Sequence, residues 1–528
     1  MNGCGLTGGE TDSFTRELIN ELFTGTGTGN KPSPGQAAGL KEACSSALQG
    51  NSTGKILLVF DALLKYRRET GFTPDDFGLT RGDLEELASK HQLIDEHGVT
   101  VGGRLLKAIP IVKAANARVA DYMAKKDADA PSGIELWEQI QKNGARIRSA
   151  LGMSDEDWGS FPGQLKYAIN TVDELARVID LPAAAIRDVT CVTRDYRMRL
   201  TPYYAGLIMP GRLDDPVLIQ SVPTGEMVDN VGEEIPPVAA DHSPARLVDQ
   251  FYPRVVSVKV TNICAMYCTH CLRIAHIGKK DRIYSKDAYQ EALDYIRGNP
   301  LIRDVLITGG DAFMLPNRMI RWILEQLDAI DHVRMKRLGT RIPVTVPMRL
   351  DAELLDILNA SNLKKPLRVV TQINTAQEIT PVSREGFRNL SSQVSAVLNQ
   401  AVLLKGINDT SVKMWKLCET IHESYVRPYY VFNCSYRNPQ FRHLRVPVET
   451  GRDIVEGMYG NISGDAIPRY ISTAGGKIPM HRDNIIGRDG DMVTMKKPWS
   501  GEEVSYPDTD QEEYENRDFG LLKYGSSE

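Results

Sequence analysis

The sequence has no apolar run of the roughly 18 residues that a membrane-spanning helix needs. Its first residues form neither a basic nor an apolar segment, so we expect no secretory signal, and Asn2 stands where myristoylation requires glycine. The net charge of −5 over 528 residues gives no sign of a basic surface for nucleic acid. Repeats of solenoid length are absent as well. These absences argue against a membrane protein, a secreted protein and a nucleic-acid-binding protein.

Cysteine is scarce too, and of the eight cysteines five are scattered at positions 4, 44, 191, 418 and 434. Scattered cysteines suit a reducing compartment and do not make a disulfide framework. We therefore expect a cytoplasmic protein. A content of 42% hydrophobic and 25% charged residues is ordinary for a globular chain.

The other three cysteines, Cys264, Cys268 and Cys271, have C-x3-C-x2-C spacing and follow a strand-like run at 255–261. Three thiolates are one fewer than a closed cluster or a structural zinc site uses, so one metal position stays open for an outside ligand. A zinc ion with His270 as its fourth ligand is the alternative. Because His270 lies between two of the cysteines, it is poorly placed to complete one tetrahedral ion.

A chain of 528 residues exceeds a single hydrophobic core, so at least two domains are expected. A capping box at Thr80 and Asp83 favours helix early in the chain, and the small polar residues at 127–133 indicate a boundary. The pattern predicts five parts: a flexible tail at 1–35, a helical extension of unknown role at 36–130, a helical lead-in at 135–245, a barrel at 246–440 and a C-terminal segment at 441–528.

Short β-branched runs predict the strands of the barrel, with helices between several of them, as at 286–297 and 319–330. Such an alternation implies an α/β fold in which helices cover a parallel sheet that curls into a partial (β/α)6 barrel. Ligands then bind at the carboxyl ends of the strands, where the three-cysteine loop lies. The six predicted strands are 255–261, 304–308, 334–338, 367–373, 400–404 and 428–433.

Two glycine-rich turns could contribute to the same site. Gly309, Gly310 and Asp311 follow the second strand, where glycine lets backbone approach a ligand and the acid can accept from an ammonium group. Lys477 follows two glycines, so a carbonyl cofactor could reach its amine and form a Schiff base. Each turn taken alone is an ordinary loop.

Six stretches taken in order resemble the lysine 2,3-aminomutase family of radical S-adenosylmethionine (SAM) enzymes, which depend on pyridoxal 5′-phosphate (PLP). The resemblance covers about residues 135–500 and leaves residues 1–130 outside it. The stretches lie at 200–204, 264–273, 306–312, 402–409, 427–430 and 463–477.

The resemblance implies three cofactors: a [4Fe-4S] cluster, SAM and PLP. It also implies a role for each matching residue. Cys264, Cys268 and Cys271 would ligate the cluster, Gly309, Gly310 and Asp311 would seat SAM, Lys477 would carry PLP near Phe432 and Gln400, and Arg273 would pair with the α-carboxylate of the substrate.

The implied activity is that of an isomerase, an amino-acid 2,3-aminomutase that moves an amino group between adjacent carbons through a radical. The resemblance further implies an external electron donor, such as flavodoxin or ferredoxin, and a homo-oligomer. Two alternatives remain: another radical reaction on an amino acid, or a non-catalytic, cluster-binding docking protein. The intact cysteine triad and Lys477 argue against the docking protein.

The substrate is not expected to be lysine. A remote ammonium group buried in a pocket needs carboxylate partners, and the family's lysine enzymes supply two aspartates. Ser435 and Thr473 stand at the matching positions here, whereas Arg437 and Arg469 lie close by and could receive an acidic side chain. The sequence therefore predicts a neutral or acidic amino acid. The family's phosphate-binding arginines are represented only by Arg254, which is shifted, so the phosphate contacts of PLP are not predicted.

Overall fold

The structure is a computed structural model that describes residues 22–23, 34–49, 59, 62–63, 65, 67, 73–90, 111–230, 243–473 and 476–525. The chain divides into two compact units, residues 1–120 and 121–528. The predicted tail at 1–35 lies almost wholly outside the described residues. No described helix is both long and apolar enough to cross a membrane.

The first unit is helical and has a hydrophobic core of its own. It contains α2 (Pro34–Gln49), the 3-10 helix η1 (Pro74–Phe77) and α4 (Arg81–Lys90). The predicted capping box is confirmed, because the Thr80 amide donates to the Asp83 carboxylate at 2.7 Å and the Asp83 amide donates to the Thr80 hydroxyl at 3.2 Å. The buried apolar residues of the described part of this core are Leu22, Leu40, Cys44, Val59, Leu63, Phe77, Leu79, Leu84 and Leu87.

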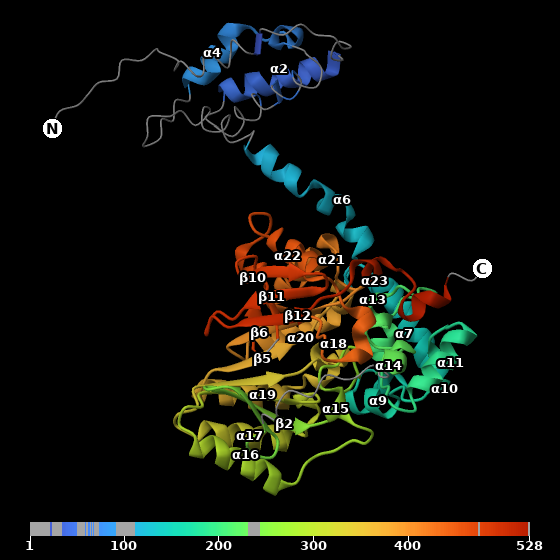
Figure 1. Cartoon of the computed structure of the whole chain (residues 1–528). Helices are drawn as coiled ribbons and strands as arrows, with labels where there is room; N and C mark the ends of the chain where they lie inside the picture. Colours follow the sequence, from blue (N-terminus) through green and yellow to red (C-terminus); the bar gives the residue numbers. More distant parts are fainter. Residues whose placement is uncertain are drawn as a thin grey trace, which may run out of the picture. The chain divides into compact units, whose positions relative to one another are not determined.

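The second unit is built on a nine-stranded sheet whose strands follow one another in sequence order. Figure 1 labels β2, β5 and β6 of this sheet. Strands β2 to β8 are parallel, and β1 and β9 pair antiparallel at the two ends of the sheet. The strands are β1 (Val248–Tyr252), β2 (Val255–Thr261), β3 (Asp304–Gly309), β4 (Met335–Gly339), β5 (Leu367–Thr371), β6 (Ala396–Leu403), β7 (Arg427–Asn433), β8 (Arg469–Ser472) and β9 (Ile478–Pro479).

The predicted α/β class and all six predicted strands are confirmed, as β2 to β7. The strands β1, β8 and β9 were not predicted. Helices between the strands bury one apolar face against the sheet; in α17, for example, Ile320, Ile323, Leu324 and Leu327 recur at helical spacing and are buried. The helices of the barrel are α15 (Ile274–Ile277), α16 (Lys286–Gly298), α17 (Asn317–Asp328), α18 (Ile342–Thr345), α19 (Ala352–Lys364), α20 (Pro381–Ser391) and α21 (Ser411–His422), with 3-10 turns η3 (Ala312–Met314), η4 (Pro347–Arg349) and η5 (Ala376–Glu378).

The helical section that precedes the barrel shares one hydrophobic core with residues of the three-cysteine loop, including Met266 and Cys268. This section begins with α6, whose residues lie within the predicted helical extension at 36–130. The Tyr122 hydroxyl donates to Glu419, and Lys416 pairs with Asp127 at 2.6 Å. The helices are α6 (Ala120–Asp129), α7 (Trp137–Leu151), α8 (Asp155–Trp158), α9 (Phe161–Lys166), α10 (Val172–Val178), α11 (Ala183–Val192), α12 (Pro202–Gly206), α13 (Pro216–Ile219) and α14 (Glu226–Asp229).

The C-terminal segment adds a small three-stranded antiparallel sheet, β10-β11-β12, beside the barrel. Its elements are η6 (Pro439–Leu444), α22 (Val448–Glu456), η7 (Gly464–Ala466), β10 (Ile485–Asp489), β11 (Met492–Lys496), β12 (Glu503–Pro507), α23 (Gln511–Glu515) and η8 (Gly520–Tyr524).

Candidate active site

The three-cysteine loop leaves the carboxyl end of β2 and is held by the helical section that precedes the barrel. The Tyr267 amide donates to the Arg199 carbonyl at 3.2 Å, and the Thr269 amide donates to the Gln220 carbonyl at 3.1 Å. The Arg199 guanidinium donates to the Cys264 carbonyl at 3.2 Å. Backbone bonds from a second segment therefore fix the loop before any metal is bound.

The thiols of this loop lie near one another and are partly exposed. Burial and then nearby negative groups raise the pKa of Cys264, and burial and the neighbouring Cys268 raise the pKa of Cys271 to about 12. Such thiols ionise when a metal binds them. In the described part of the chain, no three His, Cys, Asp or Glu side chains converge on a single ion. In a [4Fe-4S] cluster each cysteine would bind a different iron, so the three thiolates need wider spacing than the ligands of one ion.

His270 is used by the protein in a different way from a zinc ligand. Its Nε2 lies 3.3 Å from Gln372 Oε1 and 3.2 Å from Asn374 Nδ2. Burial, followed by the charge of Arg341, lowers the pKa of His270 to about 3, so the ring is neutral. The ring is therefore anchored to two amide side chains at the carboxyl end of β5.

The glycine turn after β3 supports the cluster loop directly. The Gly310 amide donates to the Thr261 carbonyl at 2.5 Å, and the Asp311 amide donates to the Ile263 carbonyl at 2.8 Å. A Cβ on Gly309, whose φ is +117°, would collide with the Thr261 carbonyl oxygen, and one on Gly310 would collide with the Ile263 carbonyl oxygen. The two glycines thus let the turns after β2 and β3 lie against each other.

Asp311 is 5% exposed and joins two β/α turns. Its Oδ1 accepts from the Thr340 hydroxyl at 2.6 Å and from the Phe313 amide at 2.9 Å, and its Oδ2 accepts from the Arg341 amide at 2.6 Å. Burial raises the pKa of Asp311 against the opposing effect of these donors. A carboxylate has about four acceptor positions, so three donors leave about one for a ligand.

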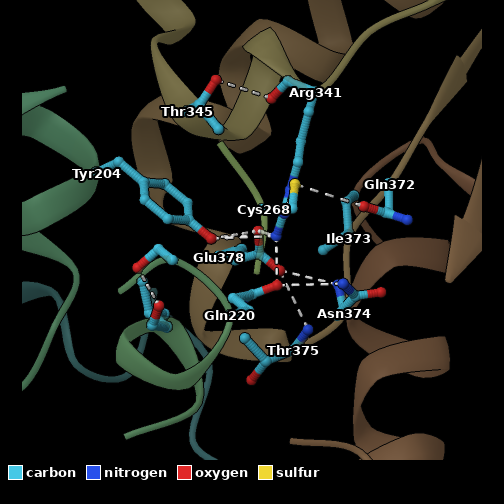
Figure 2. A network of polar contacts seen from close by, with 12 residues as sticks. Tyr204, Gln220, Cys268, Arg341, Thr345, Gln372, Ile373, Asn374, Thr375 and Glu378 are labelled. Carbon is cyan, nitrogen blue, oxygen red and sulfur yellow. Dashed lines mark hydrogen bonds and ion pairs between the residues drawn. The ribbon is translucent and has the colours of Figure 1, made fainter. Parts of the chain in front are cut away.

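Beside the loop lies a buried polar network centred on Arg341 (Figure 2). Arg341 Nη1 donates to Cys268 Sγ at 2.9 Å, and Nη2 donates to Glu378 Oε1 at 2.7 Å and to the Tyr204 hydroxyl at 3.1 Å. Nη2 also donates to Gln220 Oε1. Side chains of Tyr204, Gln220 and Glu378 therefore converge on the arginine that contacts one cysteine of the motif.

Three nitrogens of this region are buried and have no hydrogen-bond partner within the described structure: Arg341 Nε, Gln220 Nε2 and His270 Nδ1. Buried donors are rarely left unpaired in a finished protein. Together with the three thiols, they fit a polar group bound at the mouth of the barrel, as a cluster with its own ligand would be.

Lys477 lies immediately before β9, near aromatic rings of β7 and β1. Its Nζ is 4.6 Å from the ring centre of Tyr430 and 6.0 Å from that of Tyr252. Burial lowers the pKa of Lys477, and the nearby positive charge of Arg337 lowers it further. A larger share of this amine is therefore neutral and able to attack a carbonyl, which fits a lysine that holds PLP.

Phe432 and Gln400 share the same wall of the barrel. Gln400 on β6 is in register with Tyr430 on β7, and the rings of Phe432 and Tyr430 lie 5.7 Å apart between centres. Both predicted cofactor neighbours therefore lie next to Tyr430, the residue whose ring lies close to Lys477 Nζ.

The predicted substrate residues differ in burial and in hydrogen bonding. Arg273 is partly buried, and within the described residues its guanidinium has no hydrogen bond or ion pair, so it can receive a carboxylate. The Ser435 hydroxyl accepts from the Arg437 amide at 3.2 Å, and Arg437 itself is exposed and lies over Tyr436. Thr473 is exposed at the end of β8.

Sequence reasoning missed Arg341 and its partners Glu378 and Gln220. The available signal was that Arg341 lies three residues past the predicted strand at 334–338, near the strand end where ligands bind, and is followed by an apolar run. Its contact with Cys268 could not be seen because it spans 73 residues.

Comparisons with known proteins agree with this geometry. Residues 258–413 match the model of the radical SAM superfamily. The chain is 36% identical to the glutamate 2,3-aminomutase of Clostridioides difficile, over 74% of this chain and 92% of that protein. It is 34% identical to the L-lysine 2,3-aminomutases of Clostridium subterminale (65% of this chain, 83% of that protein) and of Bacillus subtilis (71% and 77%).

A three-cysteine loop at the carboxyl end of the first parallel strand of a partial barrel defines a radical SAM enzyme. Within that class, the chain belongs to the amino-acid 2,3-aminomutase family. It is an isomerase that converts an α-amino acid to a β-amino acid and uses a [4Fe-4S] cluster, SAM and PLP. The predicted family, activity and cofactors are confirmed.

Proposed function

We propose that the substrate is an acidic α-amino acid, glutamate, which the enzyme converts to the corresponding β-amino acid. The observation that carries the proposal is the charge of the barrel wall around Lys477. That wall is rich in arginine and offers no free carboxylate within the described structure.

A lysine substrate would bring an ammonium group that needs an acid. Asp304 is the acid whose charge acts on Lys477, and its Oδ1 already accepts a hydrogen bond from Arg337 Nε at 2.8 Å. The two positions at which the family's lysine enzymes have aspartates are Ser435 and Thr473. An unpaired ammonium in such surroundings is costly, so lysine is disfavoured.

The same wall suits anions. Arg337 on β4 is in register with Arg368 on β5, so both point to one face of the sheet, and the Nε of Arg368 has no partner within the described residues. Arg469 on β8 is in register with Tyr430 on β7. The phosphate of PLP and the second carboxylate of glutamate would both find guanidinium groups here.

Among the relatives, identity alone does not choose the substrate. The glutamate enzyme of C. difficile is 36% identical to this chain and two lysine enzymes are 34% identical. The charge around Lys477 is therefore the deciding argument, and the likeness to the glutamate enzyme supports it.

We assign the remaining roles as the sequence predicted them. When bound, the cluster with SAM supplies a radical and PLP supplies a carbonyl for the amino group. The chain's own residues bind and orient: Cys264, Cys268 and Cys271 ligate the cluster, Gly309, Gly310 and Asp311 seat SAM, Lys477 holds PLP beside Phe432 and Gln400, and Arg273 binds the α-carboxylate.

The surroundings of the enzyme also belong to this proposal. The cluster must receive electrons from outside, and we propose a flavodoxin or ferredoxin as the donor, in the cytoplasm. The cysteines of the described residues are all free thiols, which supports a reducing compartment. A homo-oligomer is proposed too, and sedimentation equilibrium would test it.

The test is anaerobic turnover of the reconstituted enzyme with β-deuterated glutamate, alanine and lysine, each with SAM, PLP and reductant. We expect deuterium to appear in 5′-deoxyadenosine with glutamate, and kcat/KM for glutamate to exceed that for the other two by at least roughly tenfold, the equivalent of one charge-assisted hydrogen bond. A higher kcat/KM for lysine would refute the proposal. Arg469→Gln should lower kcat/KM for glutamate more than for alanine, and Arg297→Gln, an equally exposed arginine on α16 that pairs with Asp294, serves as the matched control.

A further inference from the structure

Arg341 is a buried arginine aimed at the cluster loop. It lies at the carboxyl end of β4, is 8% exposed, and donates through Nη1 to Cys268 Sγ at 2.9 Å (Figure 2). Neither Cys264 nor Cys271 has a comparable charged donor among the described residues. The guanidinium therefore distinguishes Cys268 from the other two thiols.

The direction of this guanidinium is fixed by Glu378, which is fully buried. Glu378 Oε1 accepts from Arg341 at 2.7 Å and from the Tyr204 hydroxyl at 3.0 Å. Its Oε2 accepts from the amides of Asn374 at 2.8 Å and Thr375 at 3.2 Å. With both oxygens held, Glu378 cannot follow a moving arginine, so it keeps Nη1 directed at the sulfur.

The pair also sets the charge beside the sulfur. Arg341 contributes one positive charge in contact with Cys268, and Glu378 contributes one negative charge further away, behind the guanidinium. A positive N–H donor on a ligating sulfur stabilises the more negative, reduced form of an iron–sulfur cluster. Burial strengthens this effect, because water does not screen the charges.

We propose that Arg341 is a positioning residue that raises the reduction potential of the cluster through its charged hydrogen bond to Cys268, with Glu378 as the counter-charge that limits the rise. One electron from an external low-potential donor converts the oxidised cluster to its reduced form, and no bond at Cys268 changes. The proposal rests on the proposed role of Cys268 as a cluster ligand.

The experiment measures the midpoint potential of the reconstituted cluster in the full chain, without SAM, by a redox titration followed by electron paramagnetic resonance. Arg341→Met removes the positively charged donor to Cys268, so the potential should fall. Glu378→Gln keeps the arginine and removes the negative charge, so the potential should rise. We expect each variant to change the ratio of reduced to oxidised cluster at fixed poise by roughly tenfold, which corresponds to about 59 mV for a one-electron couple.

The two variants break the same buried ion pair from its two ends. A merely structural role would therefore move both potentials in one direction, and that result would overturn the proposal. An unchanged potential in Arg341→Met would overturn it as well. If Arg341→Met does not fold, Glu378→Gln decides alone, and an unchanged or lower potential then refutes the proposal.

Arg349→Met is the matched control, because Arg349 is equally buried in the same part of the chain, pairs with Asp351 at 3.1 Å and contacts none of the three cysteines. Its potential should equal that of the wild type. Failure of the cluster assignment itself looks different: Cys268→Ala would keep the wild-type cluster signal, whatever the Arg341 and Glu378 variants do.

Discussion

Asp311→Asn tests whether the acid after β3 supports the fold or serves SAM alone. In the structure, Oδ1 accepts from Thr340 and Phe313 while Oδ2 accepts from the Arg341 amide at 2.6 Å. An asparagine can keep its oxygen at one of these places only. Its NH2 group then faces a donor, and flipping the amide moves the conflict to the other side.

The expected loss follows from these contacts. A hydrogen bond to a charged group contributes about 1.5–3 kcal/mol, and a buried amide left without an acceptor costs about 1–3 kcal/mol more. We expect a loss of about 3 kcal/mol. With an unfolding entropy of about 2.1 cal/mol/K per residue and a unit of about 400 residues, this lowers the melting temperature by about 3–4 °C.

The assay is thermal unfolding of the apo chain, with no iron and no SAM, so that an effect on ligand binding cannot contribute. Thr340→Val removes the hydroxyl that donates to Asp311 and accepts from the Ile342 amide at 3.1 Å, and should lower stability by about 1.5–3 kcal/mol. Asp331→Asn, an exposed carboxylate just before β4, is the control and should change nothing. If Asp311→Asn melts within about 1 °C of the wild type but binds SAM poorly, the acid acts on the ligand and our account of the turn is wrong.

Three further perturbations test the site and its boundary. Cys268→Ala should abolish reductive cleavage of SAM and lower the stability of the apo chain by about 1.5–3 kcal/mol, because the thiol accepts a charged hydrogen bond from the buried Arg341; continued formation of 5′-deoxyadenosine would rule out the cluster assignment. A chain that starts at residue 121 should keep the SAM-cleaving site, since the second compact unit begins there. A chain that starts at residue 131 should melt at a lower temperature, because it loses the bonds of Tyr122 to Glu419 and of Asp127 to Lys416; equal stability of the two truncated chains would show that these bonds contribute nothing.

The barrel could be predicted from sequence because its strands are β-branched or aromatic runs separated by helices of fitting length. The runs at 255–261 and 428–433 are examples, and they became β2 and β7. β8 and β9 escaped prediction because they have four and two residues and flank the lysine loop. Periodicity does not register in so short a segment.

The boundary at 127–133 illustrates a different limit. The small polar residues there do turn the chain, but Gly133 lies against the carbonyls of Gln377 and Ile379, where a Cβ would collide. Composition reports that a turn is present and cannot report what the turn packs against. For the same reason Cys264 and Lys477 were identified from their local motifs, whereas Arg341 was not, since its importance comes from partners in other segments.

The network around Arg341 has a consequence for how the enzyme is made. Tyr204 and Glu378 are 174 residues apart in the chain, and the three cysteines lie between them. While the chain is being synthesised from its amino terminus, the cysteine loop leaves the ribosome well before Gly309, Arg341 and Glu378 exist to brace it. During that interval the thiols stand on an unfinished edge strand, accessible to the machinery that delivers iron and sulfide and equally accessible to oxidants. The long sequence separation therefore means that the cysteine loop is braced only after Glu378 has been synthesised, late in the production of the chain.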